Sequence, residues 1–141
     1  RNPNSTRPWQ HVLEPLSGYL TVAALLKNNF SLNGGAYNFG PSSEQNKSVK
    51  ELVESLSNFF PDSRYEIQDN GFNKLKESNL LKLNCDKAQK ELGWIPSLDF
   101  NQTINLTSEW YKSYFISPNK TRKISLDQIR LFSDKNTFNI N

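Results

Sequence analysis

The chain has 141 residues, of which 35% are hydrophobic and 22% are charged, and its net charge is +3. This length suits one domain with a sizeable core, and the composition is that of a globular protein, not a disordered one. Lysine and arginine are spread along the chain without a block of like charge, so no nucleic-acid partner is expected. No apolar run approaches the roughly 18 residues of a spanning helix, so no membrane partner is expected either.

The sequence contains one cysteine and no methionine, and it begins with Arg1. A single cysteine cannot form an internal disulfide, and no signal peptide opens the chain, so we expect a cytoplasmic protein. Because translation begins at methionine, residue 1 is expected to be an internal position of a longer protein. Residues 1–141 are therefore expected to form one domain, which is a fragment of a larger enzyme or binding protein.

The first predicted elements are a short strand over residues 9–13 and a helix over about 16–27. Glu14-Pro15 is typical of a helix start, because proline suits the first turn and a carboxylate suits the positive end of the helix dipole. Apolar residues then recur at helical spacing. After the turn Asn33-Gly34-Gly35, residues 36–39 predict a second short strand.

Ser48 and Glu51 have the spacing of a capping box, which predicts a helix that continues to Pro61. Strands are predicted at 65–67 and 80–83, with a polar loop between them. Three further helices are expected in the remainder of the chain. They are a short helix over 87–92 capped by Asp86 and ended by Gly93, a long helix capped by Asp99 and ended by Ser117-Pro118-Asn119, and a last helix over about 126–132 opened by Ser125 and Gln128.

The sequence lacks the usual catalytic motifs. It contains no Gly-x-Gly-x-x-Gly loop, no Walker loop and no Tyr-x-x-x-Lys pair. One histidine and one cysteine cannot form a zinc site on their own. A nucleophile pair of Cys85 and His11 is formally possible, but two lone residues so far apart favour structural roles. No catalytic residue and no metal ligand is therefore expected in this chain.

Five segments resemble one family in their order and spacing. They are residues 7–20 (RPWQHVLEPLSGYL), 37–41 (YNFGP), 81–88 (LKLNCDKA), 92–96 (LGWIP) and Thr107-x-x-Trp110-Tyr111. Together they resemble the C-terminal third of the CDP-glucose 4,6-dehydratases, which are extended short-chain dehydrogenase/reductase enzymes. The run from Arg7 to Val12 looks unlike the corresponding run of the dTDP-glucose and UDP-sugar relatives.

This resemblance implies a mixed α/β fold, namely the small nucleotide-sugar-binding lobe of such an enzyme, with three or four short strands and about five helices. It implies that the Rossmann core, with the catalytic Tyr-x-x-x-Lys pair and the NAD-binding loop, lies upstream of Arg1. The implied reaction oxidises C4 of CDP-glucose, eliminates water across C5–C6 and returns the hydride to C6, with tightly bound NAD as the shuttle. The complete enzyme is expected to be a homo-oligomer, and this chain alone is expected to be inactive.

The resemblance also assigns roles to individual residues. Arg7 matches an arginine directed at the substrate diphosphate, a role that suits a guanidinium because it can donate two charge-assisted hydrogen bonds. Asn38 matches an asparagine beside the nucleotide. The alternatives are a solvated arginine and an asparagine that bonds to nearby backbone. Trp9 and Tyr37 could stack on a base, although core packing suits them better.

Three further assignments accompany these. His11 is expected beneath the junction before the first helix as a hydrogen-bond partner, and Trp94 and Trp110 are expected in the core. Related dTDP-sugar enzymes carry a second diphosphate arginine just before the strand predicted at 80–83, where this chain has asparagine and leucine. Lys74 or Lys76 could supply that second positive charge.

Two other interpretations remain open. One is the corresponding lobe of another NAD-dependent sugar-nucleotide dehydratase or epimerase, and the other is a binding module with no catalytic parent. If a Rossmann lobe is missing, apolar surface should be exposed, and the isolated chain is expected to self-associate.

Overall fold

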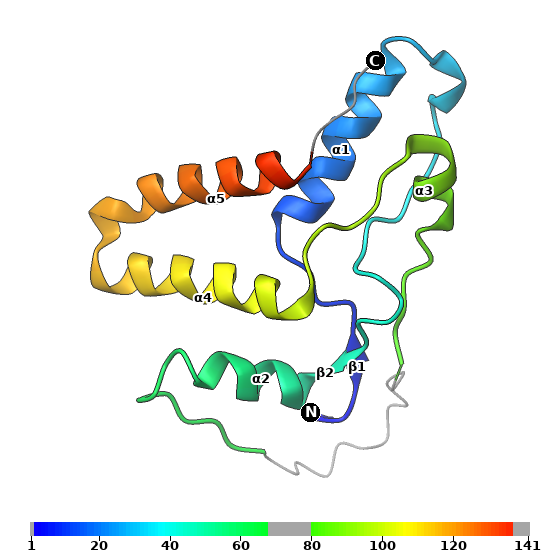
Figure 1. Cartoon of the computed structure of the whole chain (residues 1–141). Coiled ribbons are helices and arrows are strands. Elements are labelled where there is room, and N and C mark those ends of the chain that lie inside the picture. Colours follow the sequence, from blue (N-terminus) through cyan, green and yellow to red (C-terminus); the bar gives the residue numbers. More distant parts are fainter. Residues whose placement is uncertain (1, 68–79, 137–141) are drawn as a thin grey trace.

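The computed structural model describes residues 2–67 and 80–136, and Figure 1 shows them as a group of helices with a very small sheet beside the start of one of them. The described elements are β1 (Thr6–Arg7), α1 (Leu13–Leu26), the 3₁₀ helix η1 (Phe30–Leu32), β2 (Lys47–Ser48), α2 (Val49–Ser57), α3 (Asp86–Leu92), α4 (Phe100–Ile116), the 3₁₀ helix η2 (Pro118–Lys120) and α5 (Thr121–Lys135). The predicted mixed α/β class is confirmed. No Rossmann-type parallel sheet with crossover helices occurs in the two described ranges.

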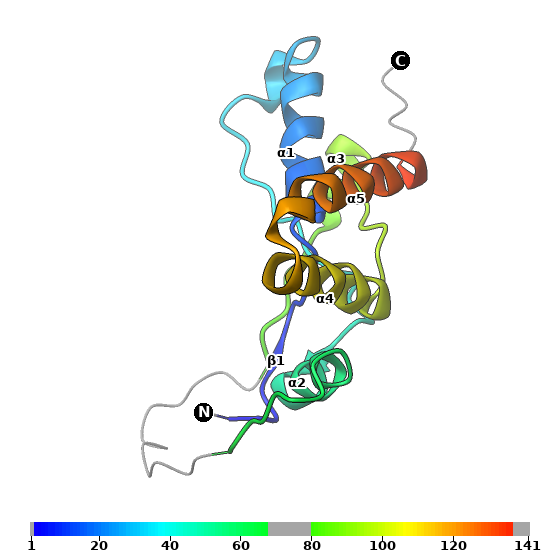
Figure 2. The same ribbon diagram turned by 90° about the vertical axis from the view of Figure 1, so that its left-hand side faces the viewer.

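The helices lie in successive layers. α4 and α5 form an antiparallel pair joined by η2, α2 lies beside α4, and α1 stands across the end of the pair with α3 beside it (Figures 1 and 2). The sheet consists of β1 and β2 in antiparallel pairing, with Thr6 opposite Ser48 and Arg7 opposite Lys47. It lies next to the start of α2, well away from the α4–α5 turn.

The buried apolar residues form two clusters. The first joins α1, α3 and the segments beside them, and it contains Leu32, Phe39, Ala88, Leu92 and Trp94. The second joins the α4–α5 pair to the start of α1, and it contains Leu98, Leu106 and Phe132 with Leu13 packed against them. The core position predicted for Trp94 is confirmed, since its side chain is 5% exposed.

Trp110 is less buried than predicted. Its side chain is half-buried, its indole Nε1 donates to Ser125 Oγ at 2.9 Å, and its ring stacks on Tyr114 at 5.5 Å between centroids. The aromatic residues that follow it on α4 are exposed, Tyr111 by 47%, Tyr114 by 49% and Phe115 by 68%. Helical spacing alone could not distinguish this partly covered face from a fully buried one.

Most helix ends agree with the local signals. The capping box of Ser48 and Glu51 is present, Asp99 caps α4 by accepting from Gln102 N, and Gly93 ends α3 with φ at +67°. Asp86 was predicted to be the cap of α3, which is wrong. Cys85 is the N-cap, Asp86 is the first helical residue, and its N–H donates to Asn84 Oδ1 at 2.9 Å.

Three helices also differ in extent from the prediction, since α1 begins at Leu13 and not at about residue 16. α2 ends at Ser57, before Pro61. The backbone then forms a turn, in which Phe59 N–H donates to Leu56 O and Phe60 N–H donates to Ser57 O. α5 begins at Thr121, so Ser125 and Gln128 lie inside it and do not form a capping box. The Ser125 hydroxyl donates to Thr121 O, and the buried Gln128 side chain donates to Leu106 O of α4 at 2.8 Å. Capping-box spacing recurs inside helices, where such side chains can serve other carbonyls.

The predicted strands at 9–13, 36–39, 65–67 and 80–83 are absent, apart from one isolated parallel bridge between Thr6 and Leu80. The two strands that do form, β1 and β2, were not predicted. A strand forms only where another segment offers hydrogen-bond partners for its backbone. The local sequence does not show whether such a segment lies nearby, and a pairing of only two residues is too short to leave a pattern.

Candidate ligand-binding site

Arg7 is held in place by the strand opposite it. Its β2 partner, Lys47, extends its ammonium to Glu51 Oε1 at 2.9 Å, and the same carboxylate accepts from Ser48 N at 2.8 Å. These bonds, led by the Ser48 backbone N–H, lower the pKa of Glu51 to about 2. The first turn of α2 therefore anchors β2, and the β1–β2 pair fixes the backbone of Arg7.

Trp9 adds a second tie to the same strand. Its indole Nε1 donates to Lys47 O at 3.0 Å, and its backbone N–H donates to Arg7 O at 2.9 Å. Trp9 is half-buried. Its orientation is therefore set by β2, and one side of its ring remains available to form the wall of a cavity.

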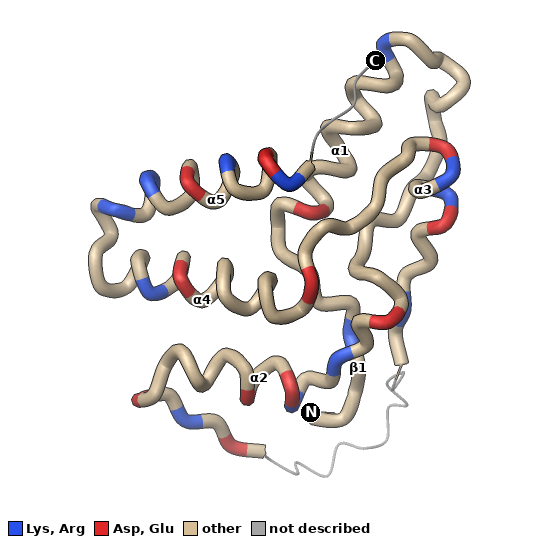
Figure 3. The backbone as a smooth tube through the Cα atoms, in the orientation of Figure 1, with Lys and Arg blue, Asp and Glu red and all other residues tan. Residues whose placement is uncertain are grey.

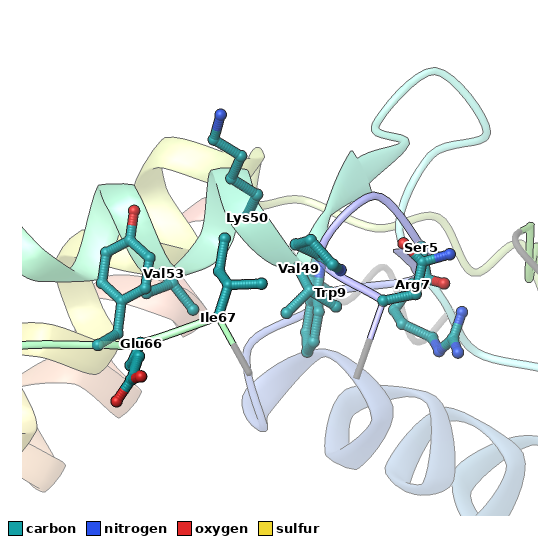
Figure 4. Close-up of a pocket in the computed structure, with 11 residues that line it drawn as sticks. Ser5, Arg7, Trp9, Val49, Lys50, Val53, Glu66 and Ile67 are labelled. Atoms are coloured by element: carbon teal, nitrogen blue, oxygen red, sulfur yellow. The ribbon is translucent and has the colours of Figure 1, made fainter. Parts of the chain in front are cut away.

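That cavity has a volume of about 330 Å³, and Arg7 lines it together with an apolar wall made by Trp9, Val49, Val53, Tyr65 and Ile67. Figure 4 shows Arg7 and Ser5 at one end and Glu66 at the other, with Trp9, Val49 and Ile67 between them. The half-buried Arg7 also donates from Nη1 to Thr6 O at 2.7 Å. A cation at the end of an apolar wall suits a ligand with an anionic part and an uncharged planar part.

Four polar residues at this cavity were not identified from the sequence, namely Asn2, Ser5, Lys50 and Glu66. Ser5 is 1% exposed, and its hydroxyl has no partner among the described residues. Lys50 also borders the cavity, but Figure 4 shows its side chain directed away from Arg7, and its ammonium lies 3.8 Å from Glu54 Oε1. No local pattern distinguishes these residues from other loop and helix polar groups.

Asn38 lies outside this cavity. Its side chain is exposed, and Nδ2 donates to Asn84 O at 3.2 Å. The structure thus places Arg7 and Asn38 on different segments without bringing both to the same cavity wall. The other two predicted residues, Lys74 and Lys76, lie outside the described residues.

His11 and Cys85 have structural environments. His11 is 6% exposed at the start of α1, its Nδ1 accepts from Leu13 N at 3.4 Å, and burial lowers its pKa. This confirms the predicted structural role. Cys85 precedes α3 with its Sγ 4.0 Å from Gly40 O, and burial raises the pKa of its thiol. A raised pKa disfavours the thiolate that a nucleophile requires.

Glu14 is more important than its predicted role as a helix-start carboxylate. It is 2% exposed, and its Oε1 accepts from Ser97 N at 2.9 Å, Ser97 Oγ at 3.2 Å and Leu98 N at 2.7 Å. Burial raises the pKa of Glu14, and the backbone bonds from Leu98 and Ser97 oppose that rise. The carboxyl group therefore ties the start of α1 to the segment that leads into α4.

Tyr37 is half-buried and packs against the first core cluster, as favoured from the sequence. Its hydroxyl donates to Glu91 Oε2 at 2.8 Å, and the Lys87 ammonium lies 4.7 Å from the centre of its ring. Tyr37 therefore joins residues 36–40 to α3. In the two described ranges, no group of three or more His, Cys, Asp or Glu side chains comes together as a metal site would require.

Comparison with known proteins identifies a protein that is similar in sequence to this chain. No protein-family model matches the chain. Over 114 residues the chain is 40% identical to the CDP-glucose 4,6-dehydratase of Salmonella typhimurium, a match that covers 81% of this chain. The resemblance predicted from the sequence is confirmed. The match covers 32% of the relative, so this chain spans about a third of the length of that dehydratase.

Proposed function

We propose that this chain is the C-terminal nucleotide-sugar-binding lobe of a CDP-glucose 4,6-dehydratase. The complete cytoplasmic lyase would convert CDP-D-glucose to CDP-4-dehydro-6-deoxy-D-glucose, and this lobe alone would be inactive. The observation that carries the proposal is the position of Arg7, fixed by β2 at the end of an apolar cavity. The similarity to a dehydratase of that name supports the same ligand.

In this proposal Arg7 holds the diphosphate, because a guanidinium donates hydrogen bonds in the fork geometry that phosphate oxygens accept. The wall formed by Trp9, Tyr65 and Ile67 contacts an uncharged part of the ligand and excludes water from it. Asn38 lies beside the nucleotide, where its side-chain amide can accept through Oδ1 while Nδ2 donates to Asn84 O.

In this proposal the binding site for NAD lies in the Rossmann lobe, which is not part of this chain. Binding of the pyrophosphate of NAD needs a glycine-rich turn between a strand and a helix N-terminus. The described residues offer no such turn. Gly18 lies inside α1, Gly34 and Gly35 follow η1, Gly40 lies outside any helix or strand, and Gly93 ends α3. When bound to the Rossmann lobe, NAD would supply the hydride transfer.

Replacement of Arg7 by alanine in the full-length protein is expected to weaken CDP-glucose binding at least 10-fold, since each charge-assisted hydrogen bond contributes about 1.5–3 kcal/mol. Isothermal titration of wild type and variant measures the loss. Arg122→Ala on α5 is the matched control, because this exposed arginine lies on a helix that does not line the cavity. Equal affinity of wild type and Arg7→Ala would remove Arg7 from the site.

Two measurements separate this proposal from the alternatives. Turnover of CDP-, dTDP- and UDP-glucose by the full-length protein distinguishes a CDP-glucose enzyme from another sugar-nucleotide dehydratase or epimerase. The gene sequence upstream of Arg1 distinguishes an enzyme from a binding module. A glycine-rich loop and a Tyr-x-x-x-Lys pair there support the enzyme.

The surface of α1 supports self-association of the isolated chain, and we also propose that the full-length enzyme is a homo-oligomer. Figure 3 shows α1 almost without charged residues, and its outer face exposes Val12, Leu16, Tyr19 and Leu20 by 45–65%. A contiguous apolar face of this kind marks a contact surface. No helix among residues 2–67 and 80–136 has the length and apolar character needed to cross a bilayer.

The isolated chain is expected to show a sedimentation coefficient that rises with concentration. Leu16→Glu combined with Leu20→Glu should reduce that rise, because charges would then lie on the exposed face. Leu126→Glu on α5, which is 42% exposed, is the control. A strict monomer at high concentration would contradict the prediction.

A further inference from the structure

Gln10 joins the two segments that carry the proposed ligand contacts. It lies three residues after Arg7, and its Nε2 donates to Phe39 O, the carbonyl next to Asn38, at 3.0 Å. The two bonded residues are 29 positions apart in the sequence. This bond therefore connects the chain that leads away from Arg7 to the chain that carries Asn38.

Residues 36–40 depend on such side-chain contacts because they have no strand partner among the described residues. The Phe39 ring packs against Gly18 of α1 and lies edge-on to Trp94 at 4.9 Å. Asn38 itself is held on the other side through Asn84 O. The Gln10 bond is thus the contact that sets the backbone of this segment relative to the Arg7 segment.

The environment of the Gln10 amide points to a positioning role. Its Oε1 is buried and has no partner in the described part of the chain. Buried polar atoms without hydrogen-bond partners are rare in native structures because they cost stability. The presence of glutamine at this position is therefore better explained by a role of its side chain than by its contribution to stability. Rotation of the amide would not relieve this atom, because Oε1 would then face the Phe39 carbonyl oxygen.

We infer that Gln10 is a positioning residue for nucleotide-sugar binding, which holds the Asn38 segment at a fixed distance from Arg7 through its bond to Phe39 O. This inference rests on the proposed function. Trp9 fixes Arg7 against β2 through Lys47 O, and Gln10 fixes the second segment from the neighbouring position. Adjacent side chains of one short segment thereby set the relative positions of both proposed contacts.

The test uses the full-length enzyme with Gln10→Leu, which keeps the side-chain size and removes the donor. We expect the KM and the Kd for CDP-glucose to rise about 5-fold or more with kcat changed less than about 2-fold, as when binding common to ground and transition state is lost. Gln45→Leu is the matched control, because Gln45 Nε2 donates to Leu98 O at 3.4 Å and does not line the Arg7 cavity. Equal changes in both variants would overturn the inference.

A double-mutant cycle gives the second readout. If Gln10 acts through the Asn38 segment, Gln10→Leu should weaken binding much less in an Asn38→Ala background than in wild type. Additive losses would overturn the inference. If Gln10→Leu does not fold, Gln10→Asn replaces it, because its shorter amide cannot reach Phe39 O in the same backbone position.

The outcomes also separate this inference from the proposed function. Absence of CDP-glucose binding and turnover in the full-length wild-type protein would refute the proposed function, whereas normal affinity in Arg7→Ala would remove only Arg7 from the site. Weak binding in Arg7→Ala and Asn38→Ala, together with normal binding in Gln10→Leu, would refute only the role of Gln10.

Discussion

Replacement of Glu14 by alanine is expected to lower the free energy of unfolding by about 3 kcal/mol. Glu14 Oε1 accepts from Ser97 N, Ser97 Oγ and Leu98 N, and its removal leaves three donors facing a small void. An unsatisfied buried donor costs about 1–3 kcal/mol, and water entering the void would compensate part of the total. Urea unfolding of wild type and variant at constant pH measures the difference.

Glu14→Gln isolates the charge from these hydrogen bonds. Glutamine keeps the Oε1 acceptor, and its amide nitrogen takes the place of the Glu14 Oε2 atom. In the wild type that Oε2 atom has no hydrogen-bond partner among the described residues. Folding raises the pKa of Glu14 above its ordinary value of 4.5. The protonated carboxyl group therefore makes its full contribution to the free energy of unfolding at pH values below the pKa of the unfolded chain. The contribution is lost as the pH rises through the folded pKa.

The stability of Glu14→Gln relative to wild type should therefore increase as the pH rises from 4 toward 8. Urea unfolding across that range checks the sign. A difference between the two proteins that does not vary with pH would contradict the raised pKa. Glu109→Gln on α4, an exposed position, serves as the control for the general effect of removing a negative charge.

Replacement of Gly18 by alanine is expected to destabilise the protein by about 2 kcal/mol, although alanine is the better helix former by about 1 kcal/mol. A Cβ at this position of α1 would lie 2.4–2.6 Å from three atoms of the Phe39 ring. That ring is 9% exposed and lies edge-on to Tyr19 and to the buried Trp94, so a shift of the ring would disturb the core around Trp94. Overpacking of this kind costs about 1–3 kcal/mol.

Phe39→Leu supplies the control for this steric explanation. The smaller side chain leaves room near Gly18, so Gly18→Ala should cost less in the Phe39→Leu background than in wild type. Urea unfolding of the two single variants and the double variant gives the coupling free energy. Additive losses would mean that Gly18 is required for some reason other than its contact with Phe39.

Local signals predicted the helices because each signal and its effect lie within one helical turn. Ser48 and Glu51 satisfy the first N–H groups of α2, Asp99 does the same for α4, and Gly93 adopts the positive φ that ends α3. Asp86 and Ser125 were assigned incorrectly because the same residue types also serve positions inside a helix. The predicted strands failed for a different reason, since residues 36–39 find side-chain contacts instead of a second strand.

The sequence by itself determined which segments form helices and where several of them begin or end, and it determined the similarity to CDP-glucose 4,6-dehydratases that singles out Arg7. Only the tertiary structure decided which side chains hold that arginine and the segments around it. Gln10 reaches a carbonyl 29 residues away, and Glu14 reaches an N–H 84 residues away. The helix signals act between residues that one turn brings together, whereas these bonds depend on which segments the packed core places side by side.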